Sequence, residues 1–187
     1  AAIDPELAAA GALLRERGIK ASSVMDVMKG AGLTVGGFYG HFGSKEQLFA
    51  ETIQSAASAT WNLLLSSARG DSPGERAMSV VRSYLSRAHR DNAEKGCLLP
   101  SAAPEVAREG EPYRSALEAE LSGFVRSLTA VLETSDDARE KALGLIALMY
   151  GALSLSRAVR GTPLSDELLK AAKKLAERAL AEEPRRS

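Results

Sequence analysis

The side chains best able to bind an anion lie close together, between positions 34 and 45 of this 187-residue chain. Thr34, Tyr39, His41 and Lys45 each carry a hydrogen-bond donor. Such donors suit the phosphate oxygens of DNA, and contacts to phosphate fix the register of a protein on the duplex rather than the sequence it selects. We therefore expect a phosphate-binding surface here, with few contacts to individual bases.

Two adjacent glycines, Gly36 and Gly37, lie inside the same segment. Glycine is less favourable than alanine in a helix by about 0.8–1 kcal/mol, so the pair needs a reason. Without side chains, the two residues let the backbone lie against base edges and the thymine methyl group. The alternatives are that the pair only lets two helices pack closely, and that Tyr39 is a half-buried core residue.

Local signals predict the first of the helices that must position these groups. The Ser23 hydroxyl can cap a helix that begins at about Val24, and Asp26 then lies near the positive end of that helix. Gly32 can adopt a left-handed backbone conformation and so end the helix.

A second and a third helix are predicted directly afterwards. Thr34 can cap a helix of about two turns over residues 35–42, with Phe38 and Phe42 on one inward face. Ser44 and Gln47 form a capping box that opens a longer helix. Two short helices joined by a tight glycine turn are typical of a helix-turn-helix motif, whose second helix enters the major groove of DNA.

Residues 31–48, which read AGLTVGGFYGHFGSKEQL, make the segment similar to the TetR family of transcriptional repressors. The resemblance covers the first 55 residues well and is only architectural beyond them, although GCLLP at 96–100 resembles a segment of one branch. It implies a homodimer that binds a palindromic operator and releases it when a small molecule enters the larger domain. It also implies that Thr34, Tyr39, His41 and Lys45 contact DNA, with Ser22 or Ser23 facing phosphate at a helix N-terminus.

The charge of this segment departs from the expectation for a DNA-binding domain. A protein that gains affinity by counterion release carries excess Lys and Arg near the DNA. Either phosphate contacts rely on helix N-termini and hydroxyls, or, as we expect, a basic arm precedes Ala1. Through residue 50 the basic side chains are Arg15, Arg17, Lys20, Lys29 and Lys45, and the acidic ones, equal in number, are Asp4, Glu6, Glu16, Asp26 and Glu46.

The composition, 45% hydrophobic and 26% charged with a formal net charge of zero, is that of an ordinary soluble globular protein. A single cysteine, Cys97, excludes an intrachain disulfide and fits a reducing cytoplasm. We expect a cytoplasmic protein that has no cofactor, no metal ion and no membrane contact.

The rest of the chain shows helical periodicity without a strand pattern. We expect an all-α fold of about nine helices, with a three-helix DNA-binding domain at 1–50 and a larger effector-binding and dimerisation domain at 51–187. A helix from Ser44 to about Ala68 is long enough to link the two domains. Another begins at Pro73 and continues past Tyr84, residues 97–107 form a short or kinked helix, and residues 134–137 cap the helix that follows.

The last two expected helices are candidates for a dimer interface. Residues 142–156 carry no charged side chain, and a seam of small residues runs along one face, while the helix at 165–182 is amphipathic. Pairing both helices with their symmetry mates gives a four-helix interface, and the alternative is an intrachain core. The interface candidates are Gly144, Ala147, Gly151, Ser154, Leu168, Ala172, Leu175 and Ala179.

An effector pocket is expected among the central helices, although an aromatic residue at helical spacing is more often a core residue than a ligand contact. The candidate ligand contacts are Trp61, Met78, Tyr84, His89, Cys97, Tyr113, Phe124 and Tyr150.

Two other classes of protein compete with a repressor. An enzyme is disfavoured because the chain, with only His41 and His89 as histidines, has no recognisable catalytic motif. An all-helical small-molecule carrier or adaptor without DNA binding is the main alternative, but a carrier has no use for the set of donors at Thr34, Tyr39, His41 and Lys45.

Overall fold

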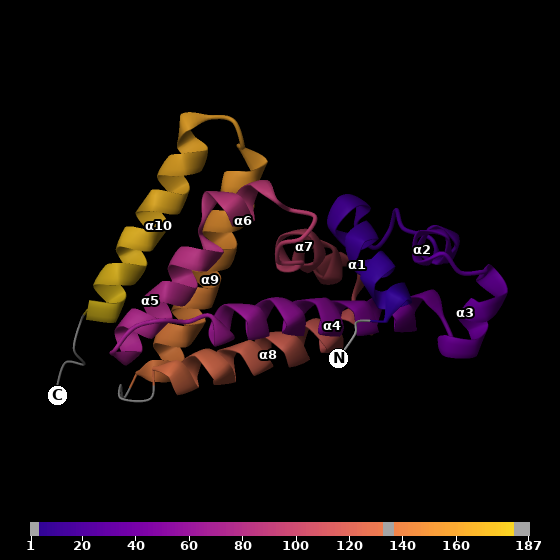
Figure 1. Ribbon diagram of the computed structural model, residues 1–187, viewed down its shortest axis with the longest axis horizontal. Helices are drawn as coiled ribbons and strands as arrows, with labels where there is room; N and C mark the ends of the chain where they lie inside the picture. The colour runs from indigo at the N-terminus through magenta and orange to yellow at the C-terminus, as the bar shows by residue number, and fades with distance from the viewer. Residues whose placement is uncertain (1–3, 133–136, 182–187) are drawn as a thin grey trace. The chain divides into compact units, whose positions relative to one another are not determined.

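The structure, a computed structural model, describes residues 4–132 and 137–181, and these residues form helices and no strand (Figure 1). They contain ten helices, where the sequence led us to expect about nine. The helices are α1 (Pro5–Arg17), α2 (Val24–Ala31), α3 (Val35–His41), α4 (Lys45–Ser66), α5 (Pro73–Tyr84), α6 (Arg87–Asp91), α7 (Leu99–Glu109), α8 (Tyr113–Val131), α9 (Ala138–Ala158) and α10 (Pro163–Ala181).

The chain divides into two compact units. The first runs from the start of the described chain to Thr60 and includes Ala93–Leu121, and the second comprises Trp61–Asn92 and the chain from Ser122 onward. Helices α4 and α8 each continue from one unit into the other. A boundary at residue 50 between two domains stays a prediction.

The helix-turn-helix forms where the capping signals predict it. Ser23 caps α2 and accepts a hydrogen bond from the Asp26 backbone N–H, while the Asp26 carboxylate accepts from the Ser23 backbone N–H. Gly32 ends α2 at a φ of 73°, a left-handed conformation that glycine adopts without strain. Phe38 of α3 and Phe42 are both buried, as the sequence predicts.

Gly11 of α1 faces α4 in the first unit. A Cβ added to Gly11 would lie 3.7 Å from the Thr52 methyl group and 3.9 Å from the Ala56 Cβ, which are ordinary van der Waals distances, and 3.1 Å from a terminal nitrogen of the Arg15 side chain. The contact between α1 and α4 therefore does not require the glycine.

Helix α7 holds the turn between α1 and α2 from outside the helix-turn-helix. The Glu105 carboxylate accepts hydrogen bonds from the backbone N–H groups of Ile19 and Lys20. Gly18 has a φ of 79°, and a Cβ there would lie 1.8 Å from Glu105 Oε1, so glycine is required twice over. Helix α7 continues through Pro104 from residue 99 to residue 109, in the region where we expected a short or kinked helix.

The second unit corrects one expected helix. We expected one helix through Tyr84, Leu85 and Ala88, but α5 ends at Tyr84, and Ser86 caps the separate short helix α6 by accepting a hydrogen bond from the His89 backbone N–H. The serine is a local stop signal that the apolar periodicity concealed.

A buried arginine joins α6 to α10. Arg90 is 8% exposed and donates to Asp166 Oδ1 at 2.7 Å, Ser165 Oγ at 2.9 Å and Asp91 Oδ1 at 2.8 Å. Arg157 of α9 donates to the backbone oxygens of His89 and Arg90, so α6 is tied to both long helices. Salt bridges to a buried arginine fix geometry more than they add stability.

The predicted cap formed by residues 134–136 lies outside the described residues. No helix of the described residues is both long enough and apolar enough to cross a membrane.

Candidate nucleic-acid interface

One side of α3 is exposed although its other side anchors the core. Phe38 is 1% exposed, whereas Tyr39 is 72% exposed, which overturns the alternative of a half-buried core tyrosine. Thr34, Gly36 and Gly37 are exposed as well. The helix therefore offers the predicted donors and the glycine pair on its outer side.

No atom of the described residues explains the glycine pair. A Cβ added to Gly36 would meet nothing within 4 Å, and one added to Gly37 would meet only the Thr34 hydroxyl at 3.8 Å. Neither glycine has a positive φ. The alternative that the pair lets two helices of this chain pack closely is therefore wrong, and the open space faces outward.

The two hydroxyl groups predicted to face phosphate differ in their surroundings. Thr34 occupies the N-cap position of α3, but its side chain makes no capping hydrogen bond. Ser23 Oγ is 2.6 Å from Asp26 Oδ2, and this hydrogen bond is the main reason that the pKa of the Asp26 carboxyl lies below its usual value. A phosphate at Ser23 would have to approach an anionic carboxylate, whereas the Thr34 hydroxyl faces no such competition.

The side chains of His41 and Lys45, two other candidate phosphate contacts of this segment, have different neighbours. His41 Nδ1 lies 2.7 Å from Glu6 Oε1, a buried carboxylate at the start of α1, while the His41 side chain is 58% exposed. Lys45 Nζ lies 5.6 Å from the centre of the Phe49 ring, which is within the range of a cation–π contact. The Glu6 contact was missed because the two residues are far apart in the sequence and a lone acidic residue gives no signal.

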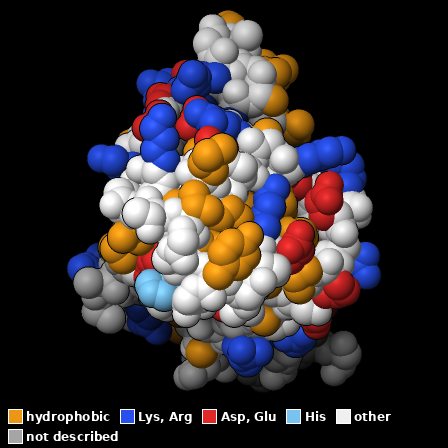
Figure 2. All heavy atoms as spheres, turned by 90° about the vertical axis from the view of Figure 1, so that its right-hand side faces the viewer, with side chains coloured by type: hydrophobic (Ala, Val, Ile, Leu, Met, Phe, Trp, Pro, Cys, Tyr) orange, Lys and Arg blue, Asp and Glu red, His pale blue; other side chains and the backbone are white. Residues whose placement is uncertain are grey.

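Exposed apolar side chains accompany the donors on α2, α3 and the turn between them. Met25 is 66% exposed, Leu33 44% and Val35 43%. Figure 2 shows hydrophobic side chains in the middle of this face, with Lys, Arg, Asp and Glu scattered around them and no continuous basic patch. Apolar groups can contact the thymine methyl in the major groove, a role that we did not predict for these residues.

The predicted dimer-interface residues lie mainly on the outer sides of α9 and α10. Gly144, Ala147 and Leu175 are exposed, and Gly151, Ser154, Leu168 and Ala179 are half-buried. A Cβ added to Gly144 or Gly151 would meet nothing within 4 Å. The large apolar side chains Leu143, Leu155, Leu164 and Leu175 are 47–58% exposed on the same two helices.

Ala172 is the exception among these candidates. It is 5% exposed and lies with Ser165, Leu169 and Ala176 on the side of α10 that the chain itself buries. Helix α10 thus has two apolar stripes, and sequence periodicity assigned Ala172 to the wrong one.

Four of the eight predicted ligand contacts form an aromatic cluster in the second unit. The rings of Trp61 and Phe124 stack with their centres 3.7 Å apart, Tyr84 stacks on Trp61 at 5.6 Å, and His89 meets Tyr84 edge-on at 4.7 Å. Burial and the nearby Arg157 charge lower the pKa of His89, against a hydrogen bond to the Tyr84 backbone oxygen that raises it. Trp61 Nε1 is buried without a hydrogen-bond partner among the described residues.

The other four candidates lie outside this cluster. Met78 and Tyr150 belong to the second unit, whereas Cys97 and Tyr113 are buried in the first. The eight candidates therefore divide between the two units.

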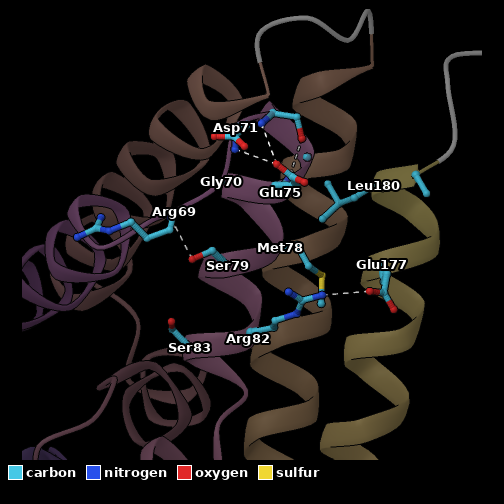
Figure 3. Close-up of a pocket in the computed structure, with 13 residues that line it drawn as sticks. Arg69, Gly70, Asp71, Glu75, Met78, Ser79, Arg82, Ser83, Glu177 and Leu180 are labelled. Carbon is cyan, nitrogen blue, oxygen red and sulfur yellow. Dashed lines mark hydrogen bonds and ion pairs between the residues drawn. The ribbon is translucent and has the colours of Figure 1, made fainter.

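A hollow of about 840 Å³ lies at the edge of the second unit, between the turn at residues 69–72, α5 and the end of α10 (Figure 3). Only Met78 of the predicted ligand contacts lines it. The Arg82–Glu177 ion pair at 3.1 Å spans it from α5 to α10. Both partners are exposed, so this pair adds little stability. Across the described residues, no group of three or more His, Cys, Asp or Glu side chains is arranged to hold a metal ion.

The fold and the exposed side of α3 define a class of protein, the all-helical regulators that carry an N-terminal helix-turn-helix. Two family models match the chain: residues 7–52 match "Bacterial regulatory proteins, tetR family", and residues 73–172 match "Tetracyclin repressor-like, C-terminal domain". The chain belongs to the TetR family of bacterial transcriptional regulators.

Individual relatives agree with this membership. The HTH-type transcriptional repressor KstR2 of Mycobacterium tuberculosis (strain CDC 1551 / Oshkosh) is 42% identical over 45 residues, which are 24% of this chain and only 22% of that protein. The crystal structure of E. coli NemR in its reduced form has a TM-score of 0.81 and 25% identity, covering 93% of this chain and 94% of that one. A putative TetR-family regulator from Rhodococcus sp. shares the fold at a TM-score of 0.79 and 17% identity, covering 95% of this chain and 97% of that one.

Proposed function

We propose that this chain is a homodimeric repressor that binds a palindromic DNA operator through α3 and releases it when a small molecule binds. The observation that carries the proposal is the glycine pair at Gly36 and Gly37. The pair costs helix stability, is exposed, and has no partner within the described chain that needs the space. A DNA groove is an external surface that needs such a close backbone approach.

The surrounding side chains support the same assignment. Thr34, Tyr39, His41 and Lys45 supply donors to phosphate, and Val35 supplies an apolar contact for a thymine methyl. Because the Ser23 hydroxyl is hydrogen-bonded to Asp26, we assign Ser23 a structural role in capping α2. The proposed phosphate contacts are then the four donors just named.

Homodimerisation is supported by the outer sides of α9 and α10. Exposed leucines beside a seam of small residues are typical of a surface that another helix covers closely. We propose that Gly144, Ala147, Gly151, Ser154, Leu168, Leu175 and Ala179 lie in a two-fold symmetric four-helix interface, in which each α9 and α10 meets its symmetry mate.

We place the effector at the aromatic cluster of the second unit. The Trp61 indole N–H is buried without an acceptor among the residues that the structure describes, which costs free energy that a ligand carrying a hydrogen-bond acceptor would recover. The stacked rings of Trp61, Tyr84 and Phe124 favour a flat apolar ligand that opens the stack. Helix α4 continues from the first unit into the second, where its residue Trp61 belongs to this cluster. Ligand binding can therefore shift the population of dimers able to dock on DNA. A protein that binds the chromosome works in the bacterial cytoplasm, which we propose as its location.

The experiment that tests this function is a selection of duplex fragments from random and genomic pools with the purified protein at a stated salt concentration. The proposal predicts enrichment of one palindromic sequence. If no sequence is enriched above its level in the input pool, the result would contradict sequence-specific DNA binding and would favour a ligand carrier or adaptor.

A further inference from the structure

A buried carboxylate lies directly behind one of the proposed phosphate contacts. Glu6, in the first turn of α1, is 2% exposed, and its Oε1 lies 2.7 Å from Nδ1 of His41, the last residue of α3. The His41 side chain is 58% exposed. A carboxylate removed from water needs a donor or a cation, and the described contact supplies it from His41.

The inference takes Glu6 as the acceptor in this contact. An ionised carboxylate only accepts hydrogen bonds, so Nδ1 of His41 then carries the proton of the Glu6 contact. The ring nitrogen that remains for DNA is Nε2. A phosphate oxygen also only accepts, so Nε2 must carry a proton as well, and an imidazole with both nitrogens protonated is a cation.

We propose that Glu6 is a positioning residue that makes His41 bind DNA phosphate as an imidazolium ion, so that operator binding takes up a proton. The inference rests on the proposed DNA-binding function and adds a pH dependence to it. It also accounts for part of the excess basic charge that residues 1–50 lack, because His41 becomes a cation at the exposed end of α3 only when the operator is bound.

The charges around His41 agree with this role. From the α1 side the ring is faced by Glu6 and by Asp4, whose carboxylate accepts a hydrogen bond from the Glu6 backbone N–H at 3.0 Å. On α3 the other titratable side chain is Tyr39. The first turn of α4 carries Lys45, held over Phe49, and Glu46.

The test is a set of operator affinities between about pH 5 and pH 8, the range in which histidine changes charge, at fixed salt and with the duplex obtained by selection. The chain has two histidines, His41 and His89. We expect wild-type affinity to fall as the pH rises, by up to about tenfold per pH unit, since one proton is taken up. His41→Gln, a change at an exposed position, should bind more weakly at low pH and show a flat profile.

Glu6→Gln separates positioning from mere packing. An amide can donate to Nδ1, which lets a neutral ring carry its proton on Nε2 and still bind phosphate. We therefore expect Glu6→Gln to bind more tightly than wild type near pH 8 and to lose the steep profile. Glu16→Gln, which makes the same change at an exposed position of α1, is the matched control and should keep the wild-type profile.

The outcomes distinguish this inference from the proposed function. Wild-type and His41→Gln profiles of equal slope would overturn the proton uptake, even if Glu6→Gln fails to fold. A Glu6→Gln protein that folds but is weaker by the same factor at every pH would make Glu6 structural. Absence of duplex binding at any pH would refute the DNA-binding function itself.

Discussion

At the scale of single residues, Gly36 and Gly37 allow a test in which stability and function move in opposite directions. Gly36→Ala and Gly37→Ala should each raise the free energy of unfolding, by up to about 1 kcal/mol, because nothing in the described part of the chain obstructs the new methyl groups. Both should weaken operator binding, because those methyl groups occupy the space proposed for DNA. Thermal unfolding and fluorescence anisotropy measure the two effects, and tighter binding by the stabilised variants would refute the assignment.

Tyr39 and Lys45 should behave as phosphate contacts. Tyr39→Phe removes one hydroxyl from an exposed ring and should cost about 1.5–3 kcal/mol of operator binding, the range for a hydrogen bond to a charged group. Lys45→Ala should also lower the salt slope of log Kobs by about 0.9. If the affinity loss instead accompanies an equal loss of thermal stability, both residues are structural.

At the scale of helices, signals within a few residues of one another predicted where a helix begins or ends, whereas contacts between residues far apart in the sequence were not predicted. The cap at Ser23 and the stop at Gly32 predicted α2, and Pro73 predicted the start of α5, because each signal acts within a few residues. The contacts of Glu105 with Ile19 and of Glu6 with His41 join segments far apart in the sequence, and no spacing rule detects them.

Periodicity also fails where one helix has two apolar sides. Ala172 and Leu175 of α10 are three residues apart, yet Ala172 is buried in the chain and Leu175 is 55% exposed. A pattern of apolar positions cannot say which side a neighbour covers, so the sequence predicted the helix but misassigned Ala172.

The Arg90 cluster makes a prediction about the helices that it joins. Arg90→Met should lower the Tm by a few degrees, because Asp91 and Asp166 lose the guanidinium that holds their pKa values below the usual value. A lowered carboxyl pKa stabilises the fold above the unfolded aspartate pKa of about 3.9, and that stability is lost as the pH falls through the folded value. The Tm difference from wild type should therefore be constant near neutral pH and shrink below about pH 4, and calorimetry across this range measures it. A difference that does not shrink would mean that Arg90 acts through packing alone.

At the scale of the whole molecule, the proposed binding to a palindromic operator depends on dimerisation through α9 and α10. Gly151→Leu should break the dimer, because a leucine fills the outward space at a seam of small residues where the partner helix must approach. The same change should leave the subunit folded, since no atom of the described chain lies within 4 Å of a Cβ there. Sedimentation measures the mass, with Lys174→Leu at an exposed position of α10 as the control for added hydrophobicity. An unchanged dimer would remove this part of α9 from the interface.

A hydroxyl-radical footprint of the wild-type protein on its selected duplex, together with the mass of the complex, shows whether two α3 helices of one dimer bind the operator. Two α3 helices of one dimer should protect two symmetry-related half-sites whose centres are about 34–36 Å apart or a multiple of that spacing. A single protected half-site bound by one subunit, or protection that is unchanged when Gly37 is replaced by leucine, would contradict the claim that paired α3 helices read the operator.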